Sequence, residues 1–74
     1  MDFTKTEIKS ELPHQQRVIV ECDELTDKLN AINLFIDSNP LFNKIDSKEQ
    51  KRLLRQSTFM ELYWGILMER INNF

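Results

Sequence analysis

The chain has few of the residues that cross-link or interrupt small proteins. Its 74 residues include one cysteine, one histidine, one glycine and two prolines. A single cysteine excludes an internal disulfide, and one cysteine with one histidine excludes a four-ligand zinc site. Because domains of this size are marginally stable without such cross-links, oligomerisation is the expected source of stability.

Long hydrophobic runs and a strong excess of one charge are also missing. Ten Lys and Arg stand against twelve Asp and Glu, a net charge of -2, which disfavours binding to duplex nucleic acid. No apolar run approaches the roughly 18 residues of a membrane span, and residues 1–10 do not form a signal-peptide core. We therefore expect a soluble intracellular protein in a reducing compartment, with no membrane partner.

Two apolar stripes with helical spacing are present instead. Both step by alternating threes and fours, which keeps their members on one face of a helix. The sequence predicts an all-α fold, an antiparallel two-helix hairpin with a short N-terminal arm or helix, which assembles into a homo-oligomer. The stripes comprise Val18, Cys22, Leu25, Leu29, Ile32 and Ile36, and then Leu53, Ser57, Met60, Trp64, Leu67, Ile71 and Phe74.

Local signals mark where these helices begin and end. Pro13 is tolerated in a first helical turn, and Asn39 before Pro40 is steered away from helical geometry. Asp46 followed by Glu49 fits the N-cap and N3 positions of a capping box. We expect a single domain over residues 1–74, with an arm at 1–12, a first helix at about 13–37, a turn at 38–46 and a second helix at about 47–73.

The second helix carries more apolar side chains than one partner helix covers. Phe59, Leu62, Tyr63 and Ile66 fall on a different side from its stripe. Exposed apolar patches of this kind usually mark an interface. We predict that these four residues form the interface of the homo-oligomer; the alternative is that the N-terminal arm folds over them in a monomer.

Gly65, the only glycine, lies inside the second helix. It costs about 1 kcal/mol relative to alanine there. A close helix crossing or a ligand against the backbone would explain it, and an ordinary surface glycine is the other interpretation.

Catalytic patterns are missing as well. We find no glycine-rich phosphate loop, no metal-ligand spacing and no pair of nucleophile and base. Cys22 lies on the first stripe, where a buried small residue is expected rather than a reactive thiol. We predict that the protein is not an enzyme and uses neither a cofactor nor a metal.

The end of the hairpin opposite the turn gathers cations. If Ile36 pairs with Ser47, the antiparallel arrangement brings His14 close to Arg70 and Arg17 close to Leu67. Phe3 and Lys5 of the arm are then within reach. Arginines beside a helix N-terminus form a plausible phosphate site. The alternative is that both arginines pair with the carboxylates of Glu21, Glu24 or Glu69.

A second basic cluster lies at the turn end. An acidic stretch occupies the other half of the first helix, and this polarity suits protomers that pack basic end against acidic end. We favour an assembly contact over a second ligand site for this cluster. Its members are Lys44, Lys48, Lys51, Arg52 and Arg55, and the acidic stretch comprises Glu21, Asp23, Glu24 and Asp27.

The arrangement resembles a family of small bacteriophage proteins. The matching features span about Leu12 to Phe74 and include Pro13-His14-Gln15-Gln16-Arg17-Val18, Asn39-Pro40, Tyr63 and Arg70-Ile71. The family is the helical-hairpin counter-defence sponges, which includes the anti-CBASS cyclic-nucleotide sponge and the hairpin of an anti-Thoeris sponge.

The resemblance implies a homohexamer of interlocked hairpins in the host cell cytoplasm. It would hold cyclic di- or trinucleotide immune signals between protomers, uncleaved, and so block activation of the effectors. The implied ligand residues are Phe3 and Tyr63 for stacking and Arg17 and Arg70 for phosphate, beside His14 at the same end.

Two other functions stay open. The exposed face of the second helix suits an adaptor or inhibitor that docks on a host protein. A small nucleic-acid-binding protein is disfavoured by the net charge, and DNA binding that weakens steeply with salt would revive it.

Overall fold

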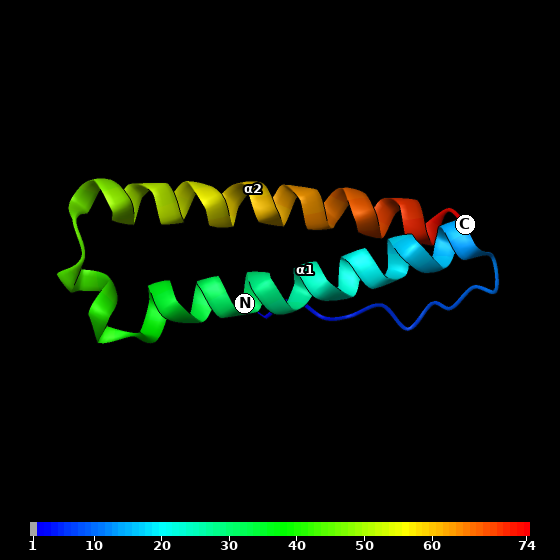
Figure 1. Ribbon diagram of the computed structural model, residues 1–74, viewed down its shortest axis with the longest axis horizontal. Coiled ribbons are helices and arrows are strands. Elements are labelled where there is room, and N and C mark those ends of the chain that lie inside the picture. Colours follow the sequence, from blue (N-terminus) through cyan, green and yellow to red (C-terminus); the bar gives the residue numbers. More distant parts are fainter. Residues whose placement is uncertain (1) are drawn as a thin grey trace.

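Two long antiparallel helices make up most of the molecule. The computed structural model describes residues 2–74 and contains α1 (Pro13–Ser38), the 3₁₀ turn η1 (Pro40–Lys44) and α2 (Ser47–Asn72), with no strand in that stretch (Figure 1). The chain forms a rod of 46 × 18 × 17 Å. The prediction of an all-helical hairpin is confirmed for these residues. Met1, the first residue of the expected arm, lies outside them.

The core is built from the two stripes. Val18, Cys22, Leu25 and Leu29 of α1 and Leu67 and Ile71 of α2 are the buried apolar residues. All six belong to the predicted stripes. Phe74, the last stripe member, is exposed, because it follows the end of α2 and the apolar stripe of α1 does not extend far enough to meet it.

Three contacts define how the helices are aligned. Cys22 lies against Met68, with their sulfurs 3.6 Å apart, Thr26 meets Trp64, and Asn33 meets Ser57. In each pair the residue numbers add up to 90. The expected pairing of Ile36 with Ser47, for which the sum is 83, is therefore wrong by about seven residues, or about 10 Å along the axis.

The connection between the helices explains this shift. Residues 40–44 fold into η1, and Phe42 packs edge-on against Phe35, with ring centroids 6.1 Å apart. The amide of Gln50 donates hydrogen bonds to the backbone carbonyls of Phe42 and Ile45. The first turn of α2 thus binds the connection and extends beyond the end of α1.

The predicted caps are formed in part. The carboxylate of Asp46 accepts a hydrogen bond from the backbone N–H of Lys48 (3.0 Å) and so caps α2. Glu49 does not complete the capping box, because its carboxylate binds Arg52 (N···O 2.7 Å) one turn further on. At the start of α1, Leu12 is the N-cap without a side-chain hydrogen bond, and Pro13 stands in the first turn.

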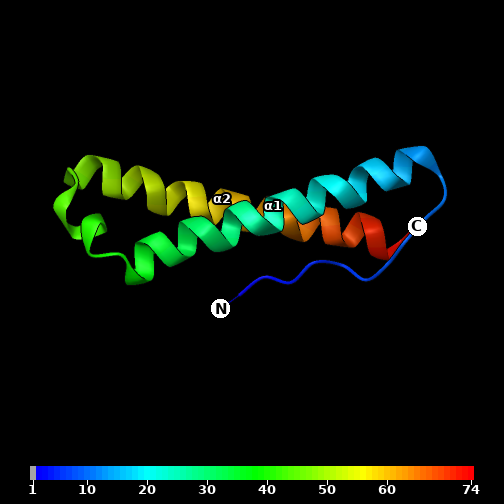
Figure 2. The same cartoon turned by 60° about the horizontal axis from the view of Figure 1, so that its bottom comes forward.

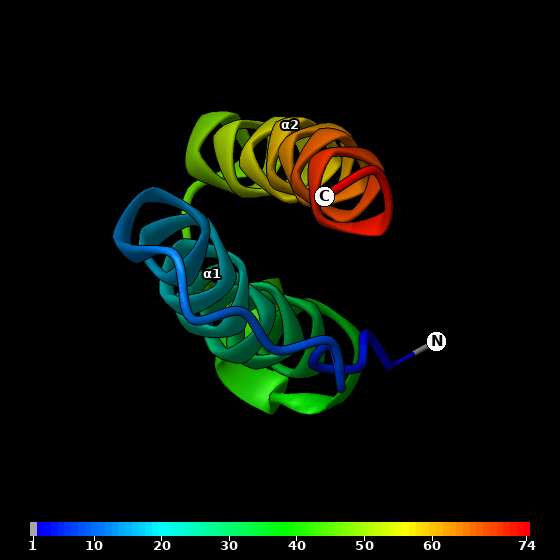
Figure 3. The same cartoon turned by 90° about the vertical axis from the view of Figure 1, so that its right-hand side faces the viewer.

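The N-terminal arm is extended. Residues 2–12 contain no helix and run back along α1 from its start towards its middle (Figures 2 and 3). Of the two alternatives for this segment, the short helix is wrong and the docking arm is observed.

No helix in the described residues combines the length and the apolar character that a bilayer crossing requires.

Candidate functional site

An uncovered apolar strip runs along α2. The exposed fractions of its side chains are 65% for Phe59, 60% for Leu62, 40% for Tyr63 and 55% for Ile66. These residues are solvent-facing because the stripe of α2 that packs on α1 lies on another side of the helix. The structure therefore leaves all four predicted interface residues available to a partner.

The arm does not cover this strip. It lies along α1, where Ile8 and Leu12 remain exposed. Phe3 reaches only the border of the strip, where it lines a shallow depression together with Leu62, Gly65 and Ile66. The alternative of a monomer whose arm buries the apolar face is wrong for the described residues.

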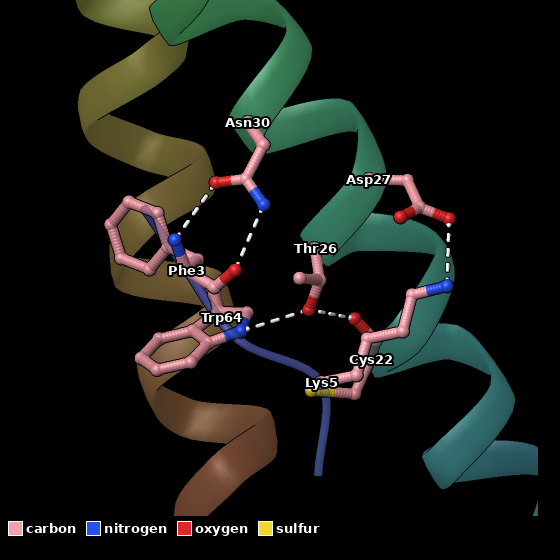
Figure 4. A network of polar contacts seen from close by, with 7 residues as sticks. All are labelled: Phe3, Lys5, Cys22, Thr26, Asp27, Asn30 and Trp64. Carbon is pink, nitrogen blue, oxygen red and sulfur yellow. Dashed lines mark hydrogen bonds and ion pairs between the residues drawn. The ribbon is translucent and has the colours of Figure 1, made fainter. Parts of the chain in front are cut away.

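Phe3 is held in place by Asn30 in the middle of α1 (Figure 4). The Asn30 side chain accepts a hydrogen bond from the backbone N–H of Phe3 and donates one to its carbonyl oxygen, both at 2.8 Å. The Phe3 ring meets Trp64 edge-on, with centroids 4.9 Å apart. An ion pair between the exposed side chains of Lys5 and Asp27 (3.1 Å) lies beside this contact.

A buried threonine links the two helices at this point. Thr26 donates a hydrogen bond to the carbonyl oxygen of Cys22 (2.8 Å) and accepts one from the indole N–H of Trp64 (3.1 Å) (Figure 4). Thr26 is the buried polar residue of the core. Because both groups are paired, the indole ring is fixed in one orientation and supports the Phe3 ring.

The cations of the open end lie close together, but the Phe3 ring lies elsewhere. In the observed alignment Arg70 lies level with Val20, about three residues or 4.5 Å along the axis from Arg17. His14 lies one turn before Arg17 at the exposed start of α1. Phe3 is bound at Asn30 instead, about 25 Å along α1 from Pro13, and Lys5 pairs with Asp27. The expectation that these two residues reach the open end is therefore wrong.

Both arginines at this end are free of ion pairs in residues 2–74. The alternative in which they pair with Glu21, Glu24 or Glu69 is therefore wrong for this structure. Tyr63 and Arg70 lie seven residues apart on one flank of α2, which places a ring and a guanidinium group on one line about 10 Å apart.

A lysine that sequence reasoning missed joins this end. Two adjacent shallow depressions share Gln16 and Val20; one is lined by Arg17 and the other by Lys9 of the arm. The extended path of the arm brings Lys9 there. No helical spacing in the sequence could have predicted this, because the arm has no regular structure.

The basic cluster of the turn end is solvent-exposed. Its five members, Lys44, Lys48, Lys51, Arg52 and Arg55, lie on η1 and the first half of α2. Arg52 is the member that forms an ion pair, with Glu49. The others are available to an anionic surface.

Cys22 is buried in the core. Burial raises the pKa of its thiol above the ordinary value of 9.0, and the neighbouring charge of Asp23 raises the pKa further. The neutral thiol contacts Met68 in the core. Within residues 2–74 no group of three or more metal-ligating side chains is present.

The hairpin as a whole corresponds to a known family. The Sequestin family model matches residues 12–73. The chain belongs to the Sequestin family. No curated protein and no solved structure matches it.

The Sequestin match covers a defined part of the molecule. It begins at Leu12, the N-cap of α1, and ends at Asn73, the C-cap of α2. It therefore contains both arginines of the open end and the whole apolar strip. The arm from residue 2 to residue 11, with Phe3 and Lys9, lies outside it. The name Sequestin itself points to sequestration of a ligand.

Proposed function

We propose that the protein is a phage-encoded sponge for cyclic oligonucleotide immune signals. It binds cyclic di- or trinucleotides as a homo-oligomer in the host cytoplasm and keeps them from their effectors. The observation that carries this proposal is the match of the Sequestin family model to the entire hairpin. The resemblance of the sequence to the phage counter-defence sponges supplies the ligand class and the hexamer.

The chemistry of the open end supports an anionic ligand. Arg17, Arg70 and Lys9 supply cationic donors, and neither arginine forms an ion pair among the described residues. Arginine matches the geometry of phosphate oxygens with paired donors. Tyr63, on the same flank of α2 as Arg70, provides a face on which a base can stack.

Assembly supplies the enclosure that a single hairpin lacks. The depressions of the open end are shallow and lie on the outer surface. Tight binding of a small ligand requires a pocket that buries most of its surface. A second copy packed on the exposed strip of α2 closes such a pocket between protomers.

Sequestration requires affinity alone, and we propose that the ligand leaves unchanged. The one thiol is buried in the core and its pKa is raised. His14 stands on the exposed start of α1.

Calorimetric titration of the assembled protein with a panel of cyclic di- and trinucleotides tests the proposal. We expect tight binding of at least one ligand and its intact recovery on chromatography after heat release. Arg17→Ala and Arg70→Ala should each weaken binding by about 10- to 100-fold, the size of a hydrogen bond to a charged group. Lys28→Ala, an exposed cation in the middle of α1, is the matched control. An assembled wild-type protein that binds none of the panel would refute the proposal.

A docking adaptor is the second candidate, because the strip of Phe59, Leu62, Tyr63 and Ile66 is exposed. It predicts a monomer or dimer in light scattering, whereas the sponge predicts a larger closed ring.

A further inference from the structure

The apolar strip of α2 is the middle of a longer pattern. Arg55, Phe59, Leu62, Ile66 and Glu69 follow one another by steps of four, three, four and three. This is the spacing of a helix-packing seam. All five lie on the exposed side of α2. α2 thus carries a second seam, next to the one that packs against α1.

The ends of this second seam carry opposite charges. Arg55 precedes the apolar residues by one turn, and Glu69 follows them. Neither side chain forms an ion pair among residues 2–74. A helix with this order of cation, apolar centre and anion is complementary to itself when turned around, because each charge then meets its opposite.

We propose that this seam binds α2 of a second copy, antiparallel, with Leu62 at the two-fold axis. Residues equally far from Leu62 then lie level on the two helices. Arg55, seven residues before Leu62, lies level with Glu69 of the second copy, seven residues after it. The contact repeats by symmetry, as an isologous dimer interface requires.

Gly65 borders the second seam. At about 100° per residue it lies about 60° from Leu62 around α2, on the side opposite to Phe59. A two-fold axis at Leu62 keeps the Phe59 rings of both copies on one flank of the contact and Gly65 on the other. A Cβ atom at Gly65 would have no neighbour within 4 Å in the single chain. A side chain at position 65 would therefore lie beside the proposed contact.

The inference rests on the proposed function only in taking the protein to self-associate. Charge reversal tests it. Arg55→Glu and Glu69→Arg each place like charges level with one another and should raise the dissociation constant of this contact by about tenfold or more. The double variant Arg55→Glu/Glu69→Arg restores both pairs and should regain the wild-type mass in light scattering.

Lys48→Glu is the matched control. It makes the same charge change on the same helix, but position 48 lies beyond the end of the partner helix in this alignment. A wild-type monomer would overturn the proposal. So would an oligomer in which Arg55→Glu and Lys48→Glu behave alike, or one that the double variant does not restore.

A cross-link tests the axis directly. Leu62→Cys should form a disulfide-linked dimer on mild oxidation, whereas Leu34→Cys, equally exposed on α1, should not. Absence of the Leu62→Cys dimer would overturn the alignment. Ligand titration of the same proteins separates the two proposals. If charge reversal dissociates the oligomer but the wild type binds no cyclic nucleotide, sequestration alone is refuted. If the oligomer binds a cyclic nucleotide but charge reversal has no effect on its mass, this pairing alone is refuted.

Discussion

Thr26 shows how one residue decides the local geometry of the core. Its hydroxyl is shared between the carbonyl oxygen of Cys22 and the indole of Trp64. The heptad pattern places Thr26 beside the stripe and gives no indication that it is buried. At this helix interface water is excluded, and the Thr26 hydroxyl supplies the hydrogen-bond acceptor that the indole N–H of Trp64 requires.

Thr26→Val should therefore lower the free energy of unfolding by about 1–3 kcal/mol, because the shape is kept while the Trp64 N–H loses its partner. Thr58→Val is the control. Thr58 also bonds to a helix carbonyl, that of Leu54 (3.1 Å), but it is exposed, so its replacement should be nearly neutral. Urea unfolding followed by circular dichroism measures both; equal losses would contradict the assigned role of Thr26.

Cys22 gives stability a dependence on alkaline pH. Burial and the charge of Asp23 raise the pKa of its thiol above 9.0. Above pH 9 the unfolded chain then loses this proton while the folded chain keeps it. The free energy of unfolding therefore falls as the pH rises past 9. We expect a steeper fall between pH 8 and 10 in the wild type than in Cys22→Ala, measured by urea unfolding; parallel curves would exclude this contribution.

At the scale of elements, the arm is attached to the hairpin by few contacts. Asn30 holds the backbone of Phe3 by two hydrogen bonds, Trp64 supports its ring, and Lys5 pairs with Asp27. The ion pair is exposed and contributes little. The first residues of the arm are thus attached mainly by one amide side chain and one aromatic contact. Close to α1, the hydroxyl of Ser10 donates a hydrogen bond to the side chain of Gln15.

Asn30→Asp should release the arm, because a carboxylate still accepts from the Phe3 N–H but repels its carbonyl oxygen. The protein has a single tryptophan. The fluorescence emission of Trp64 should therefore shift to longer wavelength as the Phe3 ring moves away from the indole and water takes its place. Asn33→Asp is the control, because Asn33 only accepts a hydrogen bond, from Ser57, and a carboxylate preserves it. An unchanged spectrum in Asn30→Asp would show that other contacts hold the arm.

At the scale of the whole molecule, the hairpin uses its two seams differently. One seam of α2 is buried against α1, with Leu67 and Ile71 in the core, and the other seam faces solvent. A rod only two helices wide has no third layer that could cover the second seam. In the proposed dimer, fold and assembly are therefore separate requirements on the same helix.

Gly65→Ala should separate these requirements. It should raise the free energy of unfolding by about 1 kcal/mol when pairing is blocked by Arg55→Glu, because alanine favours the helix and nothing lies within 4 Å of the new Cβ. In the wild-type background the same change should leave the mass of the proposed assembly unchanged, because Gly65 lies beside the second seam and on the flank opposite to Phe59. Thermal unfolding and light scattering give the two readings. A lower mass in Gly65→Ala would contradict this placement of Gly65 beside the contact.

Helix positions and the choice of core residues could be predicted from the chain because both are local. Spacing by threes and fours, Pro13, Asn39-Pro40 and Asp46 act within one or two turns, so the sequence alone indicated the two helices and the stripes that became the core. It also indicated the excess apolar face of α2, because solvent exposure follows once one seam is assigned to α1.

Alignment and docking required the folded chain. Heptad stripes pack equally well after sliding by a repeat, and only the folding of η1 under α1 and the pairs Cys22–Met68 and Thr26–Trp64 select one alignment. The same holds for the arm, where Asn30 captures Phe3 at the middle of the rod rather than at its open end. Such contacts join residues far apart in the sequence, and their free energy depends on geometry that no local pattern encodes.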